Sequence, residues 1–159
     1  MSINGLDFLN QLDQERYRVA IIHVEPLNGP LLSAFSKKLC QRSNGKYLDL
    51  LDLFINSPKL SETIDKFDPS KFKSLLKEQA ISQSLLVVDR LDFILDTWRV
   101  SERQNFYRLV KNQWDGYMNG MKAKLLLCLQ TSQEIEILDI KDSKGQSRVL
   151  KLNDFEDLV

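Results

Sequence analysis

The chain has 159 residues, of which 43% are hydrophobic and 28% charged, so composition favours one folded domain over residues 1–159 and excludes a disordered chain. Twenty-two basic residues balance 22 acidic ones, which excludes a global positive field for nucleic acid but leaves a local patch open. The N-terminus lacks a signal peptide pattern and no stretch approaches roughly 18 apolar residues, so we expect a cytoplasmic protein without membrane contact.

Taken in chain order, apolar spacing predicts helices that alternate with strands. The expected elements are a helix over 6–12, a strand over 19–24, a helix from 31 to about 44, a short strand over 46–51 that runs into helical turns, a helix starting at Asp68-Pro69, a strand over 85–89, a helix opened by Ser101, a strand over 123–131 and a β-hairpin around the DSKGQ turn. Several strands are continuous apolar runs, which need cover on both faces of a parallel sheet. We therefore predict an α/β, P-loop NTPase-like three-layer domain with a mostly parallel sheet and a C-terminal β-hairpin.

The segment VEPLNGPLL, residues 24–32, lies where a phosphate-binding loop would follow the first strand. In one register of G-x-x-x-x-G-K-[ST], Gly29 takes the second glycine position. Pro30 and Leu31 then replace the lysine that neutralises phosphate charge and the hydroxyl that binds magnesium. Two prolines also remove N–H donors from the loop. We interpret it as a tight strand-to-helix turn, the alternative being a nucleotide held in another way.

LLVVDRLDF resembles a Walker B segment, in which an apolar strand delivers Asp89 to the edge of the sheet. The next residue is Arg90, a cation that cannot act as the general base expected there. Gln130 ends the strand over 123–131, where such ATPases place a polar sensor of the γ-phosphate. If a nucleotide binds, we expect Gly29, Asp89 and Gln130 to contact it; otherwise Asp89 caps the strand end. ATP and magnesium are disfavoured, so we expect no cofactor and no catalytic residue.

Other catalytic and metal sites find little support. His23 is the single histidine and lies inside an expected strand, and Cys40 and Cys128 are far apart and outside any C-x-x-C pattern. We expect both cysteines to be buried and reduced, with no metal site.

The segment from Arg99 to Trp114 interleaves cations with aromatic residues. Arg103, Tyr107 and Lys111 follow a spacing of four, so they share one helix face. Such a face suits an acidic partner or nucleic acid, and the alternative is a solvated surface beside a buried apolar stripe.

The chain resembles one known family: BrxF, the small P-loop protein of type 3 bacteriophage-exclusion (BREX) systems. The resemblance lies in the chain length, in LLVVDRLDFILDTW, in YLDLLDLF and LSETIDKFDP, and in the closing segment with SRV. It implies a P-loop fold and a role in phage defence. The implied partners are larger components of that system, namely an ATPase, a methyltransferase, a phosphatase-like protein and a helicase. Of the family's P-loop positions, only Gly29 and Asp89 are retained.

The preferred interpretation is a non-hydrolysing, P-loop-like accessory or scaffold subunit of a BREX-type complex. In it, Arg99, Arg103 or Arg148 reaches a partner's nucleotide as an arginine finger. One alternative is a weak ATPase or nucleotide switch that uses Asp89 with an unorthodox loop. Another is a DNA-binding accessory protein that uses the basic-aromatic helix. The sequence leaves open whether the protein forms homo-oligomers.

Overall fold

The strands of the computed structural model, which describes residues 2–117 and 120–158, form one parallel sheet in the order β2-β3-β4-β1-β5. The strands are β1 (Val19–Val24), β2 (Lys46–Asp49), β3 (Leu85–Asp89), β4 (Lys124–Gln130) and β5 (Val149–Lys151). The expected α/β class and parallel sheet are confirmed, and within the described residues all five strands run parallel.

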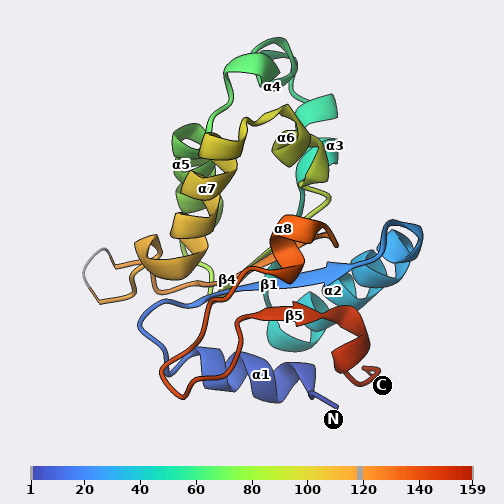
Figure 1. Cartoon of the computed structure of the whole chain (residues 1–159), viewed down its shortest axis with the longest axis vertical. Helices are drawn as coiled ribbons and strands as arrows, with labels where there is room; N and C mark the ends of the chain where they lie inside the picture. The colour runs from blue at the N-terminus through green and yellow to red at the C-terminus, as the bar shows by residue number, and fades with distance from the viewer. Residues whose placement is uncertain (1, 118–119, 159) are drawn as a thin grey trace.

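Helices cover both faces of this sheet (Figure 1). The α-helices are α1 (Gly5–Leu12), α2 (Gly29–Ser43), α3 (Leu50–Ile55), α4 (Pro58–Glu62), α5 (Pro69–Gln79), α6 (Asp92–Thr97), α7 (Val100–Arg108) and α8 (Gln133–Glu136). Shorter helical turns are η1 (Pro26–Asn28), η2 (Ile64–Lys66), η4 (Leu152–Asp154) and the π-helical η3 (Leu109–Gln113), which continues α7.

Alternate residues of the central strands face two separate hydrophobic cores. On β1, Ile21 joins the core made with α5, α6 and α7, whereas Ile22 joins the core made with α1 and α2. Val87 of β3 and Leu127 of β4 both have a relative exposure of 0%, as their apolar strands predict. The sheet is therefore the middle of three layers, which explains why these strands carry no polar alternation.

Local signals place several helix ends where the sequence predicts them. Asp68 caps α5, since its Oδ1 accepts a hydrogen bond of 2.9 Å from the amide of Lys71. Asn44 ends α2 in the left-handed conformation with φ of 55°, a role that asparagine tolerates better than most residues.

The C-terminal β-hairpin is a wrong prediction. The segment EIEI enters α8, because Ser132 caps it by accepting from the amide of Ile135, and β5 pairs in parallel with β1. Between these elements the DSKGQ turn is closed by one isolated bridge, Lys141 with Ser147. The opening of α7 also differs: it begins at Val100, and the Glu102 carboxylate accepts from the amide of Arg99 at 3.0 Å.

Candidate functional site

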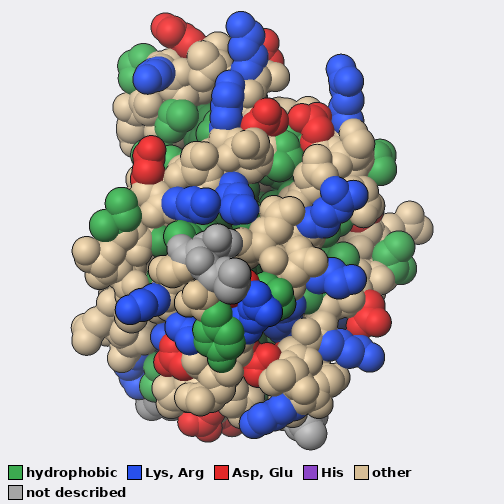
Figure 2. Space-filling view, turned by 90° about the vertical axis from the view of Figure 1, so that its left-hand side faces the viewer, with side chains coloured by type: hydrophobic (Ala, Val, Ile, Leu, Met, Phe, Trp, Pro, Cys, Tyr) green, Lys and Arg blue, Asp and Glu red, His purple; other side chains and the backbone are tan. Residues whose placement is uncertain are grey.

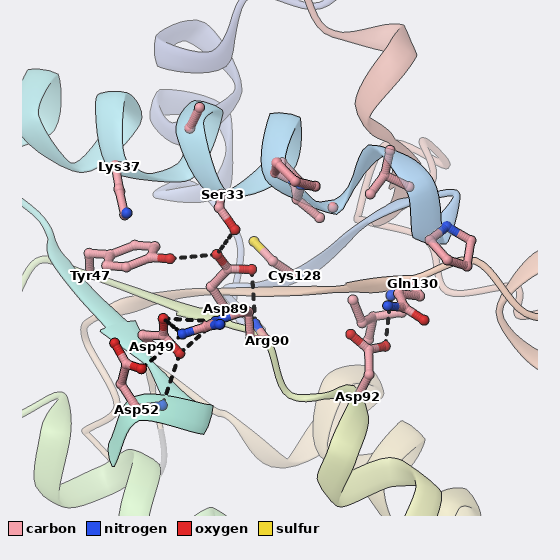
Figure 3. Close-up of a pocket in the computed structure, with 17 residues that line it drawn as sticks. Ser33, Lys37, Tyr47, Asp49, Asp52, Asp89, Arg90, Asp92, Cys128 and Gln130 are labelled. Carbon is pink, nitrogen blue, oxygen red and sulfur yellow. Dashed lines mark hydrogen bonds and ion pairs between the residues drawn. The ribbon is translucent and has the colours of Figure 1, made fainter. Parts of the chain in front are cut away.

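A cavity of about 690 Å³ lies at the carboxyl ends of β1, β3 and β4 (Figure 3). β1 leads into α2 on one face of the sheet, whereas β3 leads into α6 and α7 on the other. Open α/β sheets bind ligands in the crevice where consecutive connections diverge in this way. The structure brings Gly29, Asp89 and Gln130 together around this cavity, which we call the carboxyl-edge cavity.

Two amides of the loop between β1 and α2 bond carbonyls of the same loop. The Asn28 amide donates to the Glu25 carbonyl at 2.8 Å, the Gly29 amide donates to the Pro26 carbonyl, and Pro26 and Pro30 have no N–H. A phosphate loop works in the opposite way, with its amides converging on the anion. This loop therefore has the hydrogen bonding of a helix-entry turn.

Gly29 has no local need to be glycine. Its φ of −48° and ψ of −46° are helical, and a Cβ atom built on it meets no heavy atom within 4 Å. Pro30 lies in the first turn of α2, where a missing N–H is harmless. Leu31, at the position of the metal-binding hydroxyl, is 61% exposed, and Leu27, in η1, is 94% exposed, so this loop presents two leucines to solvent.

Asp89 is buried and its carboxylate is bonded by neighbouring side chains. Its Oδ2 accepts hydrogen bonds of 2.5 Å from both Ser33 Oγ and Tyr47 Oη, and its Oδ1 accepts from the amide of Arg90 at 2.9 Å. Burial is the main cause that raises the pKa of Tyr47, and the neighbouring Asp89 carboxylate raises it further. The Tyr47 hydroxyl therefore stays protonated and donates. We call Ser33, Tyr47 and Asp89 the Asp89 cluster; it joins α2 and β2 to β3.

Arg90, in the position where a catalytic glutamate was expected, is used in an ion-pair network. Its backbone has φ of 55°, and its guanidinium bonds both carboxylate oxygens of Asp49 and, at 2.9 Å, the Asp52 carboxylate. With Asp89 and Asp92, four carboxylates line the cavity, against the two cations Arg90 and Lys37. This balance of charge opposes the binding of a polyphosphate.

Gln130 takes part in this site through its main-chain amide rather than as a side-chain sensor of phosphate. The Gln130 amide donates to Asp92 Oδ1 at 2.8 Å, which ties the end of β4 to the first turn of α6 (Figure 3). Burial raises the pKa of Asp92, since desolvation disfavours its charged form.

The expected basic-aromatic face packs largely inside the molecule. Tyr107 is buried and donates to Glu134 Oε2 at 2.8 Å, and Arg103 Nε donates to Glu134 Oε1 at 2.8 Å, so both bind α8. Lys111 and Arg99 are exposed. On the expected face, Arg103 and Tyr107 thus form an internal contact with α8, whereas Lys111 faces solvent.

Arg148 lies in the interior, with 4% exposure. Its guanidinium donates to five main-chain carbonyls, those of Tyr17, Val19, Val110, Lys111 and Lys141, at 2.9 to 3.2 Å. A guanidinium held in this way is not presented to a partner. Among the three arginines considered as fingers, Arg99 is the exposed one, since Arg103 is bonded to Glu134.

His23 and the two cysteines have structural surroundings. His23 is buried and its Nδ1 bonds Thr131 Oγ1 at 2.8 Å, while burial lowers its pKa. Cys40 and Cys128 are buried free thiols, and burial raises the pKa of Cys40 to about 11. Within residues 2–117 and 120–158, no group of three or more His, Cys, Asp or Glu residues is arranged to hold a metal ion.

Ser33 and Tyr47, like the carboxylates Asp49, Asp52 and Asp92, are site residues that the sequence analysis did not single out. A signal existed: Tyr47 and Asp49 alternate along β2 beside Val87 and Asp89 of β3, which places both near the end of the Asp89 strand. Ser33 carries no such signal, because its approach to Asp89 depends on how α2 packs on the sheet.

Searches of protein-family models, curated proteins and solved structures gave no match to this chain. Among the described helices, none is long and apolar enough to cross a membrane.

Proposed function

We propose that the protein is a non-hydrolysing, P-loop-like accessory subunit that binds a larger protein. The order of strand, short loop, helix and Asp-terminated strand supports the P-loop-like assignment, as does a cavity at the shared carboxyl edge. The observation that carries the proposal is the Asp89 cluster: three internal donors occupy the carboxylate that a nucleotide-hydrolysing relative would use for magnesium.

The rim of the carboxyl-edge cavity supports a role in binding protein. Leu27 and Leu31 are exposed at the loop where a phosphate would otherwise sit, and exposed leucines beside a recess suit a protein contact. From the family resemblance, we propose that the partner is a larger component of a phage-defence complex, such as its ATPase or methyltransferase.

Calorimetric titration with ATP and magnesium tests the non-hydrolysing assignment. We expect no binding at millimolar nucleotide, because the loop lacks lysine, hydroxyl and converging amides. Micromolar affinity that is lost in Asp89→Ala would instead support a weak ATPase or nucleotide switch. That second function is favoured by one observation, the volume and position of the cavity.

Co-purification from the native host tests the accessory role. A Leu27→Ser, Leu31→Ser double variant should fold normally yet lose the defence-system partner, since both side chains are exposed. The matched control is Ile55→Ser with Ile81→Ser, which alters side chains that are 66% and 69% exposed away from the cavity. Equal retention of the partner by both variants would refute the loop as the contact.

A further inference from the structure

A recess of about 320 Å³, lined by residues of α6, α7 and α8, adjoins the carboxyl-edge cavity. Asp92 and Gln130 line both hollows, so the two lie on either side of the contact between the end of β4 and the start of α6. We call the two hollows together the carboxyl-edge groove. Two adjoining hollows of this size offer more room than a single ion fills, and they suit a segment of polypeptide.

Exposed apolar side chains stand on two of the segments that border the groove. Leu27 and Leu31 are exposed in the loop whose prolines line the cavity, and Ile137 is exposed at the end of α8, which lines the adjoining recess. The strands β1 and β4 are paired in register up to Val24 and Gln130, so these two segments leave the sheet side by side. Apolar side chains beside a hollow favour a protein ligand over a small ion.

The groove carries more negative than positive charge. Six carboxylates line it, against three cations. Two of the cations, Arg90 and Arg103, are ion-paired with three of the carboxylates. The other carboxylates are those of Asp89, Asp92 and Asp96, and none of them has an ion-pair partner in the part of the chain that the structure describes. An excess of negative charge therefore remains after the internal ion pairs have formed.

Asp92, which lines both hollows, is the carboxylate on which this excess acts. Burial raises its pKa, and the charges of Asp96 and Asp89 raise it further, since like charges disfavour the ionised form. The ionised carboxylate is thus held at a cost to stability, which is common for groups that are kept for binding. A cation beside Asp92 would offset both the burial and the repulsion.

The basic charge of the molecule gathers on another face. Acidic and basic residues are equal in number over the whole chain. Figure 2 looks onto the face where β1 and β4 begin, and Lys and Arg side chains cover much of its middle. A basic ligand is repelled by that face and attracted to the groove at the other end of the strands, so the distribution of charge orients its approach.

We propose that the carboxyl-edge groove binds a basic segment of the partner protein, with a guanidinium or ammonium group beside Asp92 and Asp96. Apolar side chains of the same segment pack on Leu27 and Leu31. This proposal rests on the proposed accessory function, because it gives the chemistry of the partner at the same edge of the sheet. Nucleic acid and acidic proteins are disfavoured there by the same excess of charge.

Fluorescence anisotropy of the full chain with a labelled peptide that alternates leucine with arginine tests the proposal. Peptides that alternate leucine with glutamate, or serine with arginine, should bind at least about tenfold more weakly, because each lacks one half of the required chemistry. Asp92→Asn with Asp96→Asn should weaken binding of the leucine–arginine peptide about fivefold or more. The same change should make that binding less sensitive to salt, because screened charge pairs have been removed.

The matched control is Glu62→Gln with Asp65→Asn, which removes two exposed carboxylates of α4 and η2 outside the groove. Thermal melting checks that each variant is folded. The proposal is overturned if wild type does not bind the leucine–arginine peptide up to about 1 mM. It is equally overturned if the leucine–glutamate peptide binds as tightly, or if the control variant loses as much affinity as the groove variant.

Co-purification from the native host separates this proposal from the accessory function. Loss of the partner by the Leu27→Ser, Leu31→Ser variant, with full retention by the Asp92→Asn, Asp96→Asn variant, would refute the basic segment and leave the accessory function standing. Retention by both variants would refute both proposals at this edge of the sheet. Loss by both, together with retention by the Glu62→Gln, Asp65→Asn control, is the result that we expect.

Discussion

Each edge of the sheet holds a deeply buried charged residue, Asp89 at the carboxyl edge and Arg148 at the amino edge, and their hydrogen bonds are satisfied in different ways. Asp89, at the carboxyl edge, is bonded by two side-chain hydroxyls and one amide, whereas Arg148, at the amino edge, is bonded by five main-chain carbonyls. Neither charge has a direct ion-pair partner within bonding distance in the described residues. The Asp89 arrangement depends on the identity of Ser33 and Tyr47, while that of Arg148 depends only on the path of the chain.

The two edges therefore differ in how they tolerate sequence change. Main-chain carbonyls remain whatever side chains surround them, so Arg148 is a fixed structural element. Hydroxyl donors are removed by single substitutions such as Tyr47→Phe, so the carboxyl edge is the one whose chemistry substitutions can readily alter. We expect this difference to appear in the free energy of unfolding, most strongly when Arg148 is replaced.

Replacing Arg148 should cost the most stability. Arg148→Met keeps the aliphatic part of the side chain but removes all five hydrogen bonds and leaves buried carbonyls unpaired. We expect a loss of about 3 kcal/mol or more in the free energy of unfolding, measured with chemical denaturant. Arg108→Met is the control: Arg108 is exposed and donates to Asn105, so it should change stability by less than about 0.5 kcal/mol.

The substitution Asp89→Asn tests whether the Asp89 carboxylate stabilises the fold or is kept for ligand binding. The amide retains one acceptor oxygen, but its NH₂ group opposes either the hydroxyl donors or the Arg90 amide. If the Asp89 carboxylate is structural, this change should therefore lower the free energy of unfolding by about 1 to 3 kcal/mol, measured with chemical denaturant. A carboxylate kept for ligand binding often costs stability, so a more stable Asp89→Asn protein would contradict our interpretation. Asp65→Asn, at an exposed position, is the control.

The smallest effect concerns Asp92 and appears as a pH dependence. Burial raises the pKa of Asp92 in the folded protein above the ordinary 3.8, so the folded state holds the proton more tightly than the unfolded state. Stability from this group is present at low pH and is lost as pH rises from 3.8 through the raised value. Asp92→Asn keeps an acceptor for the Gln130 amide and should raise the melting temperature at pH 7 relative to wild type.

That stabilisation by Asp92→Asn should shrink as the pH falls below the ordinary carboxyl pKa, because wild-type Asp92 is then protonated as well. A constant difference between Asp92→Asn and wild type across this range would show that the carboxyl is not desolvated.

Much of the fold follows from the sequence, since four of its strands are signalled by apolar runs or by β-branched residues between turn signals. The strand β5 lies in SRVLKL, which was expected to be an arm of the hairpin, but its partner was not predicted, because VLK is too short for its pattern to specify one and its pairing with β1 depends on the whole sheet. The Asp89 strand end and the absent loop lysine were both readable. Ser33 and the interior position of Arg148 were not, because both depend on contacts between segments far apart in the chain.

The two cores on opposite faces of the sheet carry different natural probes. Both tryptophans, Trp98 and Trp114, are buried in the core with α5, α6 and α7, and their indole N–H groups donate to the carbonyls of Phe67 and Ala123. Both cysteines lie in the core with α1 and α2. Intrinsic fluorescence therefore reports the opening of one face and thiol labelling the opening of the other, without any engineered label.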